Sequence, residues 1–238
     1  MTLLKKTVAA CAVALAGLAA VPAGAAVVGT IPGGQTNEFI DAIGVTQIEG
    51  WFGANLYLIA GPGGANLTVT YYGAEAGYQN SFTYDACGFS HNSGGNTITG
   101  LPVGGVGSTC LLNGVLAGLL NYSFSTNGGA GSVVNGFNPD NTTAGVPNVF
   151  ITFGDIGSFD TDGNGSTSGG GQVAWLFLDD GGGVARPGQP DDDNHDDLII
   201  RIAIANGTFQ VPEPTSLALL GAALLGLGAA RRRSATKQ

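Results

Sequence analysis

Basic residues are scarce in this chain, which has 8 lysines and arginines against 17 aspartates and glutamates among 238 residues. All 17 acidic residues lie between Glu38 and Glu213, and only Arg186 and Arg201 share that stretch, so its formal net charge is −15. Such a charge excludes nucleic acid as a default partner and repels anionic polymers unless cations bridge them. Bound divalent cations would relieve the self-repulsion, although solubility alone is an alternative reason for an acidic chain.

The signatures of common enzyme classes are missing as well. The chain contains no Gly-x-Ser-x-Gly, no phosphate-binding loop and no His-Glu-x-x-His. A glycosidase needs only two carboxylates in different environments. Glutamate is rare, however, and the aspartates crowd into glycine-rich loops; Glu75, just after a strand-like run, is the best single acid. We therefore predict a non-enzymatic protein.

Helix signals are almost absent from residues 26–210, where no capping box leads into a stretch of helical period. Short apolar, β-branched or aromatic runs between glycine-rich turns are frequent instead. We predict strands over 55–60, 67–72, 81–84, 119–125, 149–153, 173–178, 198–205 and 208–211, with residues 61–64 as a hairpin turn between the first two. The pattern predicts an all-β domain, an antiparallel β-sandwich with a jelly-roll as one form of it. A β-helix is the weaker alternative, because no fixed repeat is present.

Two of these runs differ in the faces that they should bury. Residues 173–178 are apolar throughout, which is typical of a central strand covered on both faces. In the run 198–204, Leu198, Ile200, Ile202 and Ile204 share one face and Arg201 lies on the other. We expect this second strand to be half exposed.

The N-terminus has the order of a secretory leader. Lys5 and Lys6 precede an apolar stretch over residues 8–21, and residues 23–25 are the small residues that a signal peptidase reads. We predict a cleaved signal peptide over residues 1–25, with signal peptidase as a partner. Residues 26–210 then form one domain, long enough to bury a core.

The last 28 residues have three parts in a fixed order: Pro212-Glu213-Pro214, an apolar run over 215–230, and three arginines at 231–233. The prolines disfavour helix just before them, so the segment around Glu213 should be extended and open to processing. The apolar run would be about 24 Å long as a helix, somewhat short of the ~30 Å hydrocarbon core. The arginines should stay cytoplasmic. An ordinary anchor that is never cut is the alternative.

These three parts closely resemble the PEP-CTERM sorting signal of Gram-negative bacteria, and the resemblance covers only residues 211–238. It implies that an exosortase-type transpeptidase processes the chain near Pro212, Glu213 and Pro214, while the apolar helix holds it transiently in the inner membrane. It also implies export to the cell surface or to the extracellular polysaccharide matrix.

Cysteine usage fits export. Cys11 lies within the leader, so Cys87 and Cys110 are the remaining pair. In an oxidising compartment we expect them to form a disulfide. A thiol nucleophile built from Cys87 and His91 is the rival, and we reject it because no helix would place both side chains on one face.

Residues 160–165, Asp-Thr-Asp-Gly-Asn-Gly, fit the opening of a calcium-binding loop. Oxygen ligands at alternate positions and a glycine at the sharp turn let a short segment wrap a hard cation. The candidate ligands are Asp160, Asp162 and Asn164. Gly171 stands where the closing glutamate of such a loop would be, so the site must take ligands from elsewhere. A plain polar turn is the alternative.

A second acidic group precedes the 198–205 strand. Residues 194–201 resemble a form, Asp-x-Asn/Asp-Asp followed by three hydrophobic residues and a basic one, that follows an acidic-tipped strand in exported β-domains with PEP-CTERM tails; here Asn194 replaces the first aspartate. In that resemblance calcium is the ligand, and the implied binding residues are Asp179, Asp180, Asp193, Asp196 and Asp197. Crowded carboxylates repel unless a cation screens them, and a solvated acidic loop is the alternative.

The histidine within this group, His195, does not by itself predict zinc, because three further nitrogen or sulfur ligands are not available near it in the sequence.

We therefore predict an exported, non-enzymatic protein of the cell surface or exopolysaccharide matrix, sorted by an exosortase, with acidic loops that bind calcium. One alternative is a carbohydrate-active enzyme. Another is a carbohydrate-binding module, for which the candidate stacking residues are Trp51, Tyr71, Tyr72 and Trp175, although packing in a core is the commoner role of such residues.

Overall fold

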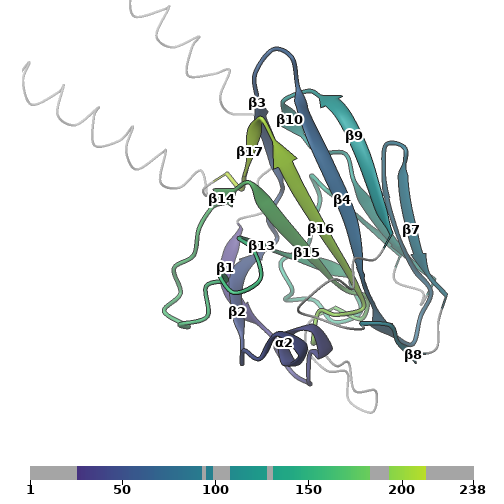
Figure 1. The fold of residues 1–238 in the computed structure, drawn as a ribbon. Helices are drawn as coiled ribbons and strands as arrows, with labels where there is room; N and C mark the ends of the chain where they lie inside the picture. Colours follow the sequence, from purple (N-terminus) through teal and green to yellow (C-terminus); the bar gives the residue numbers. More distant parts are fainter. Residues whose placement is uncertain (1–25, 93–94, 99–107, 128–130, 183–192, 213–238) are drawn as a thin grey trace, which may run out of the picture.

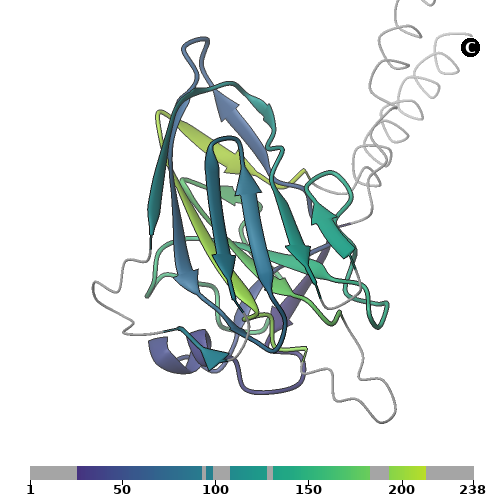
Figure 2. The same ribbon diagram turned by 90° about the vertical axis from the view of Figure 1, so that its right-hand side faces the viewer.

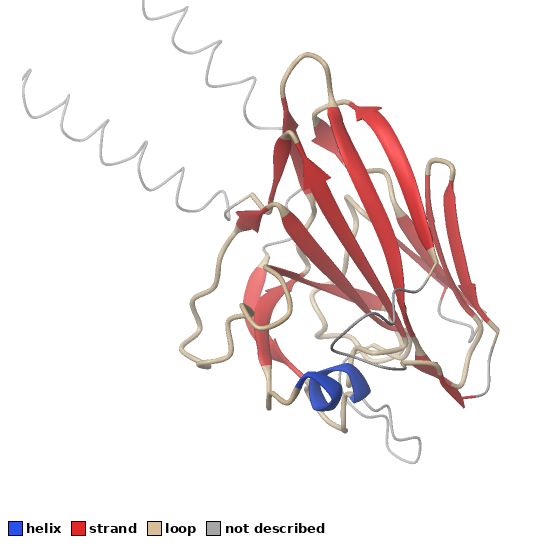
Figure 3. Cartoon of the chain, in the orientation of Figure 1, coloured by secondary structure: helices blue, strands red, loops and turns tan. Residues whose placement is uncertain are grey.

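The computed structural model describes residues 26–92, 95–98, 108–127, 131–182 and 193–212 (Figure 1). Antiparallel strands make up nearly all of its regular structure, with one short helix (Figure 3). The predicted all-β, antiparallel fold class is confirmed, and the jelly-roll connectivity stays a prediction. The expected signal peptide and the apolar run 215–230 lie outside the described residues. Within the described residues, no helix has the length and apolarity needed to cross a membrane.

The largest sheet has seven strands in the order β1-β2-β13-β15-β16-β4-β9. Their bounds are β1 (Val27–Ile31), β2 (Ile48–Phe52), β13 (Asn148–Phe153), β15 (Val173–Asp179), β16 (Leu198–Ala205), β4 (Ala65–Gly73) and β9 (Thr109–Val115). Every residue of β15 after Val173 is buried. The prediction of a central strand over 173–178 is therefore confirmed.

Three smaller sheets complete the fold. One has the order β12-β11-β6-β7, with β12 (Gly131–Val134), β11 (Ser123–Thr126), β6 (Asn80–Tyr84) and β7 (Cys87–His91). Another has the order β10-β3-β17-β14, with β10 (Gly118–Leu119), β3 (Tyr57–Ala60), β17 (Gly207–Gln210) and β14 (Gly170–Gly171). The last pairs β5 (Glu75–Ala76) with β8 (Gly95–Asn96). The single strand expected over 119–125 is thus two strands, which belong to different sheets.

Apolar side chains are buried on both faces of the seven-stranded sheet. On one face, Leu176 and Ile200 belong to a cluster with Phe82, Tyr122 and Phe124, so the β12-β11-β6-β7 sheet packs there (Figure 2). Alternate residues of a strand point to opposite faces. The second cluster, on the other face, accordingly contains the neighbouring residues Trp175 and Ile199.

The second cluster is covered by a helix that the sequence analysis did not predict, α2 (Glu38–Ile43). The Asn37 side chain accepts a hydrogen bond from the Ile40 N–H at 2.9 Å, and Gly44 ends the helix with φ of 75°. The Phe39 ring lies 5.1 Å from Trp175 and 5.2 Å from Phe177. A helix of six residues is too short to show a period, and burial of its apolar side stabilises it.

This cover also corrects the expectation for the strand 198–204. Ile199, expected on an exposed face, is fully buried in the cluster under α2. Farther along the same face, Arg201 is only partly buried and forms an ion pair with Asp155. The first half of β16 is therefore covered on both faces, and only its second half fits the expected pattern.

The hairpin predicted around residues 61–64 was wrong, although the turn exists. The Gly64 N–H donates to the Gly61 carbonyl at 2.9 Å. However, β3 pairs with β17, and β4 pairs with β16, in two different sheets. The chain bends at residues 61–64 and again at Asn206, whose φ is 66°. The segments β3–β4 and β16–β17 therefore run antiparallel to each other along their length. Both pass between the β10-β3-β17-β14 sheet and the seven-stranded sheet.

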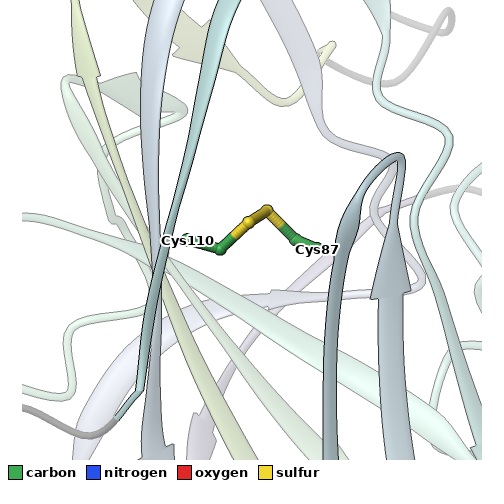
Figure 4. The surroundings of a disulfide bond; sticks show 2 residues. All are labelled: Cys87 and Cys110. Carbon is green, nitrogen blue, oxygen red and sulfur yellow. A yellow bond between two sulfur atoms is a disulfide. The ribbon is translucent and has the colours of Figure 1, made fainter.

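The predicted disulfide is present between Cys87 of β7 and Cys110 of β9 (Figure 4). These two strands belong to different sheets, so the bond ties the β12-β11-β6-β7 sheet to the edge of the seven-stranded sheet.

Replacing both cysteines, Cys87→Ala with Cys110→Ala, should destabilise the purified protein by about 3 kcal/mol, because the link removes loop-closure entropy from the unfolded chain. For a domain of this size the melting temperature should fall by about 6–12 °C. Wild type in reductant is the control and should approach the variant. Alkylation of Cys87 and Cys110 in the unreduced protein, seen by mass spectrometry, would contradict the prediction.

Candidate metal centre

The sequence-predicted aspartates meet where β15 ends and β16 begins. Asp179 is the last residue of β15, and its cross-strand partner is Asn148, the first residue of β13. Residues 193–197 lead into β16, the other neighbour of β15. The start of α2 holds this segment, because the Asn37 side chain donates to the Asn194 carbonyl at 2.6 Å. Four segments that are distant in sequence therefore surround one point.

Asp179, Asp193 and His195 each offer one ligand atom, and these atoms lie within 4.8 Å of one another. His195 Nδ1 is 4.0 Å from Asp179 Oδ2 and 3.7 Å from Asp193 Oδ1. Both distances are too long for hydrogen bonds. The side chains of Asp179 and His195 are fully buried, and that of Asp193 is 21% exposed. Among the described residues, neither Asp179 Oδ2 nor His195 Nδ1 has a hydrogen-bond partner. We call these three residues the Asp179 centre.

A chain of hydrogen bonds fixes the tautomer of His195. A carboxylate only accepts, so Asn141 Nδ2 donates to Asp193 Oδ1, at 3.0 Å. The Asn141 carbonyl oxygen then accepts from Asn148 Nδ2, at 2.8 Å. This leaves Asn148 Oδ1 to accept from His195 Nε2, at 2.9 Å. The ring proton of neutral His195 therefore lies on Nε2, and the Nδ1 lone pair faces the two carboxylates.

The surroundings hold both ends of the centre in place. The His195 ring lies 5.3 Å from Phe52 and 6.1 Å from Phe150, in edge-on geometry. Asp179 Oδ1 accepts hydrogen bonds from the N–H groups of Gly181, at 2.9 Å, and Gly182, at 2.7 Å. A side chain at Gly182 would overlap the Val146 carbonyl. These contacts turn Asp179 Oδ2 toward the imidazole.

Two non-glycine residues of the centre have left-handed backbone angles, with φ of 43° at Asp193 and 63° at His195. Such conformations cost of the order of 1–3 kcal/mol each and persist where the surroundings impose them. The Gly33 N–H donates to the Asp193 carbonyl at 2.8 Å and fixes one of them.

Burial shifts the two pKa values of the centre in opposite directions. It raises the pKa of Asp179 from 3.8 to about 6, against the hydrogen bonds from Gly182 and Gly181, which lower it. It lowers the pKa of His195 from 6.5 to about 4, against the Asp193 charge. The contribution of Asp179 to stability therefore falls as the pH rises from about 4 to about 6. That of His195 falls as the pH drops from about 6.5 to about 4.

Three of the five predicted aspartates are outside this centre, although all are buried. Asp196 Oδ2 accepts from the Glu38 N–H at 2.6 Å, and Asp197 Oδ2 accepts from the Asp180 N–H at 2.8 Å. The Asp180 carboxylate accepts from Asn80 Nδ2. These carboxylates anchor the loop to α2 and β6. The solvated loop weighed as an alternative does not describe residues 194–197, which are buried.

Beside the loop at 160–165 lies a further candidate ligand that was not predicted from the sequence. Glu49 of β2 is fully buried and forms a group with Asp160 and Asp162. Its carboxylate accepts from the Gly163 N–H at 2.9 Å and the Gly165 N–H at 2.7 Å. Asn164 Nδ2 donates to Asp162 Oδ2 at 2.7 Å. A ligand from outside the loop was expected, but no local pattern identified it as Glu49.

The C-terminal tail begins where the domain ends. Val211 is buried, and its N–H donates to the Gly169 carbonyl at 2.8 Å, whereas Pro212 is exposed. Glu213 and Pro214 lie outside the described residues. Residues 210–233 match the family described as the PEP-CTERM protein-sorting motif. This chain carries a PEP-CTERM sorting signal. The signal implies export and processing by an exosortase. No curated protein and no solved structure matches the chain.

In the domain that precedes this sorting signal, the indoles considered as sugar-stacking residues are packed inside. Trp175 is fully buried and Trp51 is 9% exposed. Trp175 Nε1 donates to the Gly154 carbonyl and Trp51 Nε1 to the Ser168 carbonyl, both at 2.9 Å. Tyr71 and Tyr72 are half-buried. The structure therefore gives the two tryptophans a role in packing.

Asp179→Asn should stabilise the protein in EDTA at pH 7.5 by about 2–3 kcal/mol, because it removes a buried charge and keeps the Oδ1 acceptor. The melting temperature should rise by about 4–12 °C, and the gain should shrink as the pH falls from about 6 toward 4. Asp193→Asn, at a partly exposed position, is the matched control and should change the melting temperature less. A lower melting temperature for Asp179→Asn under these conditions would refute the argument.

Proposed function

We propose that the folded domain is a non-enzymatic component of the cell surface or of the extracellular polysaccharide matrix. The observation that carries this proposal is the PEP-CTERM signal, which directly follows a disulfide-linked β-domain. The domain ends at Val211, and the processing motif starts with the exposed Pro212. Exosortase can therefore reach its motif while the domain stays folded, and the domain is the part that is delivered.

The environment of the clustered carboxylates supports a role without catalysis. A general acid or base must come within hydrogen-bond reach of its substrate. Asp179 and His195 are fully buried, and both oxygens of Glu49 accept hydrogen bonds from backbone N–H groups. These side chains are surrounded by protein groups. The catalytic carboxylates of a glycosidase must instead be accessible to a sugar. Their arrangement is suited to holding loops together.

We further propose that calcium binds at the loop 160–165, with Asp160 and Asp162 from the loop and Glu49 from β2 as its carboxylate ligands. Residues 161–166 are exposed to solvent, whereas the Glu49 side chain that contacts this loop is fully buried. Oxygen-only ligands suit calcium. A cation here would neutralise part of the charge of −15 and reduce the repulsion of an anionic polysaccharide.

Glu213→Ala, or deletion of residues 231–233, should leave the protein unprocessed in the inner membrane, because each removes a part of the signal that exosortase recognises. Cell fractionation and the apparent mass of the protein would show this. Deletion of residues 236–238, which keeps the three arginines, is the control and should be delivered normally. Normal surface delivery of both altered proteins would overturn the sorting mechanism.

Calcium at one hundred times its dissociation constant should stabilise the protein by about 2.7 kcal/mol, a rise of about 5–10 °C in melting temperature at fixed ionic strength. Asp160→Asn with Asp162→Asn should abolish the rise, because it removes ligand charge with little change of shape. Asp85→Asn, in the β6–β7 turn, removes one charge and should leave the calcium-dependent rise in melting temperature unchanged. An equal rise with magnesium or sodium would mean screening and would refute a calcium site.

A further inference from the structure

The Asp179 centre contains an imidazole nitrogen, and this separates it from the oxygen-only sites that calcium prefers. Mixed nitrogen and carboxylate ligands suit divalent transition metals such as zinc and manganese. We propose that Asp179, Asp193 and His195 bind one divalent transition-metal ion, with Zn²⁺ as the probe that represents this class. The sequence near His195 offers no further nitrogen or sulfur ligands, and the fold supplies two carboxylates instead.

The distances between the ligand atoms fit an ion better than a proton. A proton shared between nitrogen and oxygen holds them about 2.7–3.2 Å apart. His195 Nδ1 lies 4.0 Å from Asp179 Oδ2 and 3.7 Å from Asp193 Oδ1. Zinc binds nitrogen and carboxylate oxygen at about 2.0–2.2 Å, so two of its ligand atoms are roughly 3–4 Å apart. A bound ion would satisfy both separations with little movement.

The residues behind the ligands are those that a metal-binding histidine needs. Such a histidine donates its second ring N–H to a fixed acceptor, which sets the tautomer. Here His195 Nε2 donates to Asn148, and Asn148 is held by Asn141, which in turn donates to Asp193. One hydrogen-bond chain therefore orients two of the three ligands. The third, Asp179, is oriented by the N–H groups of Gly181 and Gly182.

Binding a cation would also remove the energetic cost of two buried polar atoms that lack hydrogen-bond partners. A buried polar atom without a partner costs about 1–3 kcal/mol, and more when it is charged. Asp179 Oδ2 and His195 Nδ1 are both in this condition among the described residues, although every other polar atom of these side chains has a partner. The Asp193 side chain is 21% exposed, so the centre meets solvent at this residue. The cation would satisfy both atoms at once.

The test uses the full-length protein, stripped with EDTA and dialysed, at pH 7.5. Isothermal titration calorimetry should show that one equivalent of Zn²⁺ binds, and Zn²⁺ should raise the melting temperature. The control is a protein that carries Asp160→Asn with Asp162→Asn. In this variant, Ca²⁺ and Mg²⁺ at the same concentration should not raise the melting temperature. That background removes the proposed calcium loop, so the failure of either site is seen separately. Co²⁺ in place of Zn²⁺ should give a visible d–d absorption band that is stronger than that of the hydrated ion, because a site built from protein ligands has a low coordination number.

His195→Asn should weaken Zn²⁺ binding at least 100-fold and remove the cobalt band, and asparagine tolerates the left-handed backbone at this position. His91→Asn is the matched control, since His91 is also buried but lies on β7 outside the centre. Asp179→Asn should melt higher than wild type in EDTA and yet lose the response to Zn²⁺. A residue with a purely structural role would not combine these two effects.

Three results would overturn the proposal. The first is a Zn²⁺ response that is the same in wild type and Asp179→Asn, because binding would then lie elsewhere. The second is a larger response to Ca²⁺ that Asp179→Asn abolishes, because the centre would then be a calcium site. The third is the absence of stoichiometric Zn²⁺ binding to the stripped wild-type protein.

Discussion

The rest of the structure depends on the burial of β15 on both faces. Leu176 packs toward the smaller β12-β11-β6-β7 sheet, and Trp175 and Phe177 pack toward α2. A strand that is apolar on both sides needs a layer on each side. One layer is the β12-β11-β6-β7 sheet. The other is α2, a six-residue helix that would not be stable as an isolated peptide. The order of the sheet places β13 and β16 beside β15, so their ends are brought to its end.

This constraint explains why acidic residues are buried at the end of β15. The strand ends with Asp179, and the chain that returns as β16 must pass the same point beneath the start of α2. Buried carboxylates are tolerated only when their oxygens are bonded. Most oxygens of this loop meet that condition through backbone N–H groups and asparagines. Asp179 Oδ2 does not, and neither does the nearby imidazole nitrogen. The Asp179 centre therefore lies where hydrogen-bond partners are missing among the described residues.

Features written in one short stretch of sequence were predictable, and those made by distant contacts were not. The apolar run of β15, the pairing of Cys87 with Cys110 and the tail at 210–233 are local patterns, and each was predicted correctly. The contact of Glu49 with Gly163 spans 114 residues, and that of His195 with Asn148 spans 47. No period or motif encodes such contacts. The hairpin at 61–64 failed for a related reason, because the turn chemistry was right but the pairing partners lie more than a hundred residues away in β16 and β17.

Export bears on how this domain can be stabilised. A disulfide persists in an oxidising compartment, and a metal ion bound only by the folded state stabilises it by mass action. The Cys87–Cys110 bond therefore suits an exported domain, and the ions proposed at Glu49 and Asp179 would add to its stability once bound. On the proposed binding, carboxylates that repel one another in the metal-free domain would act as ligands. The PEP-CTERM signal implies export, so the folded domain would carry these supports to the place where an exosortase processes its tail.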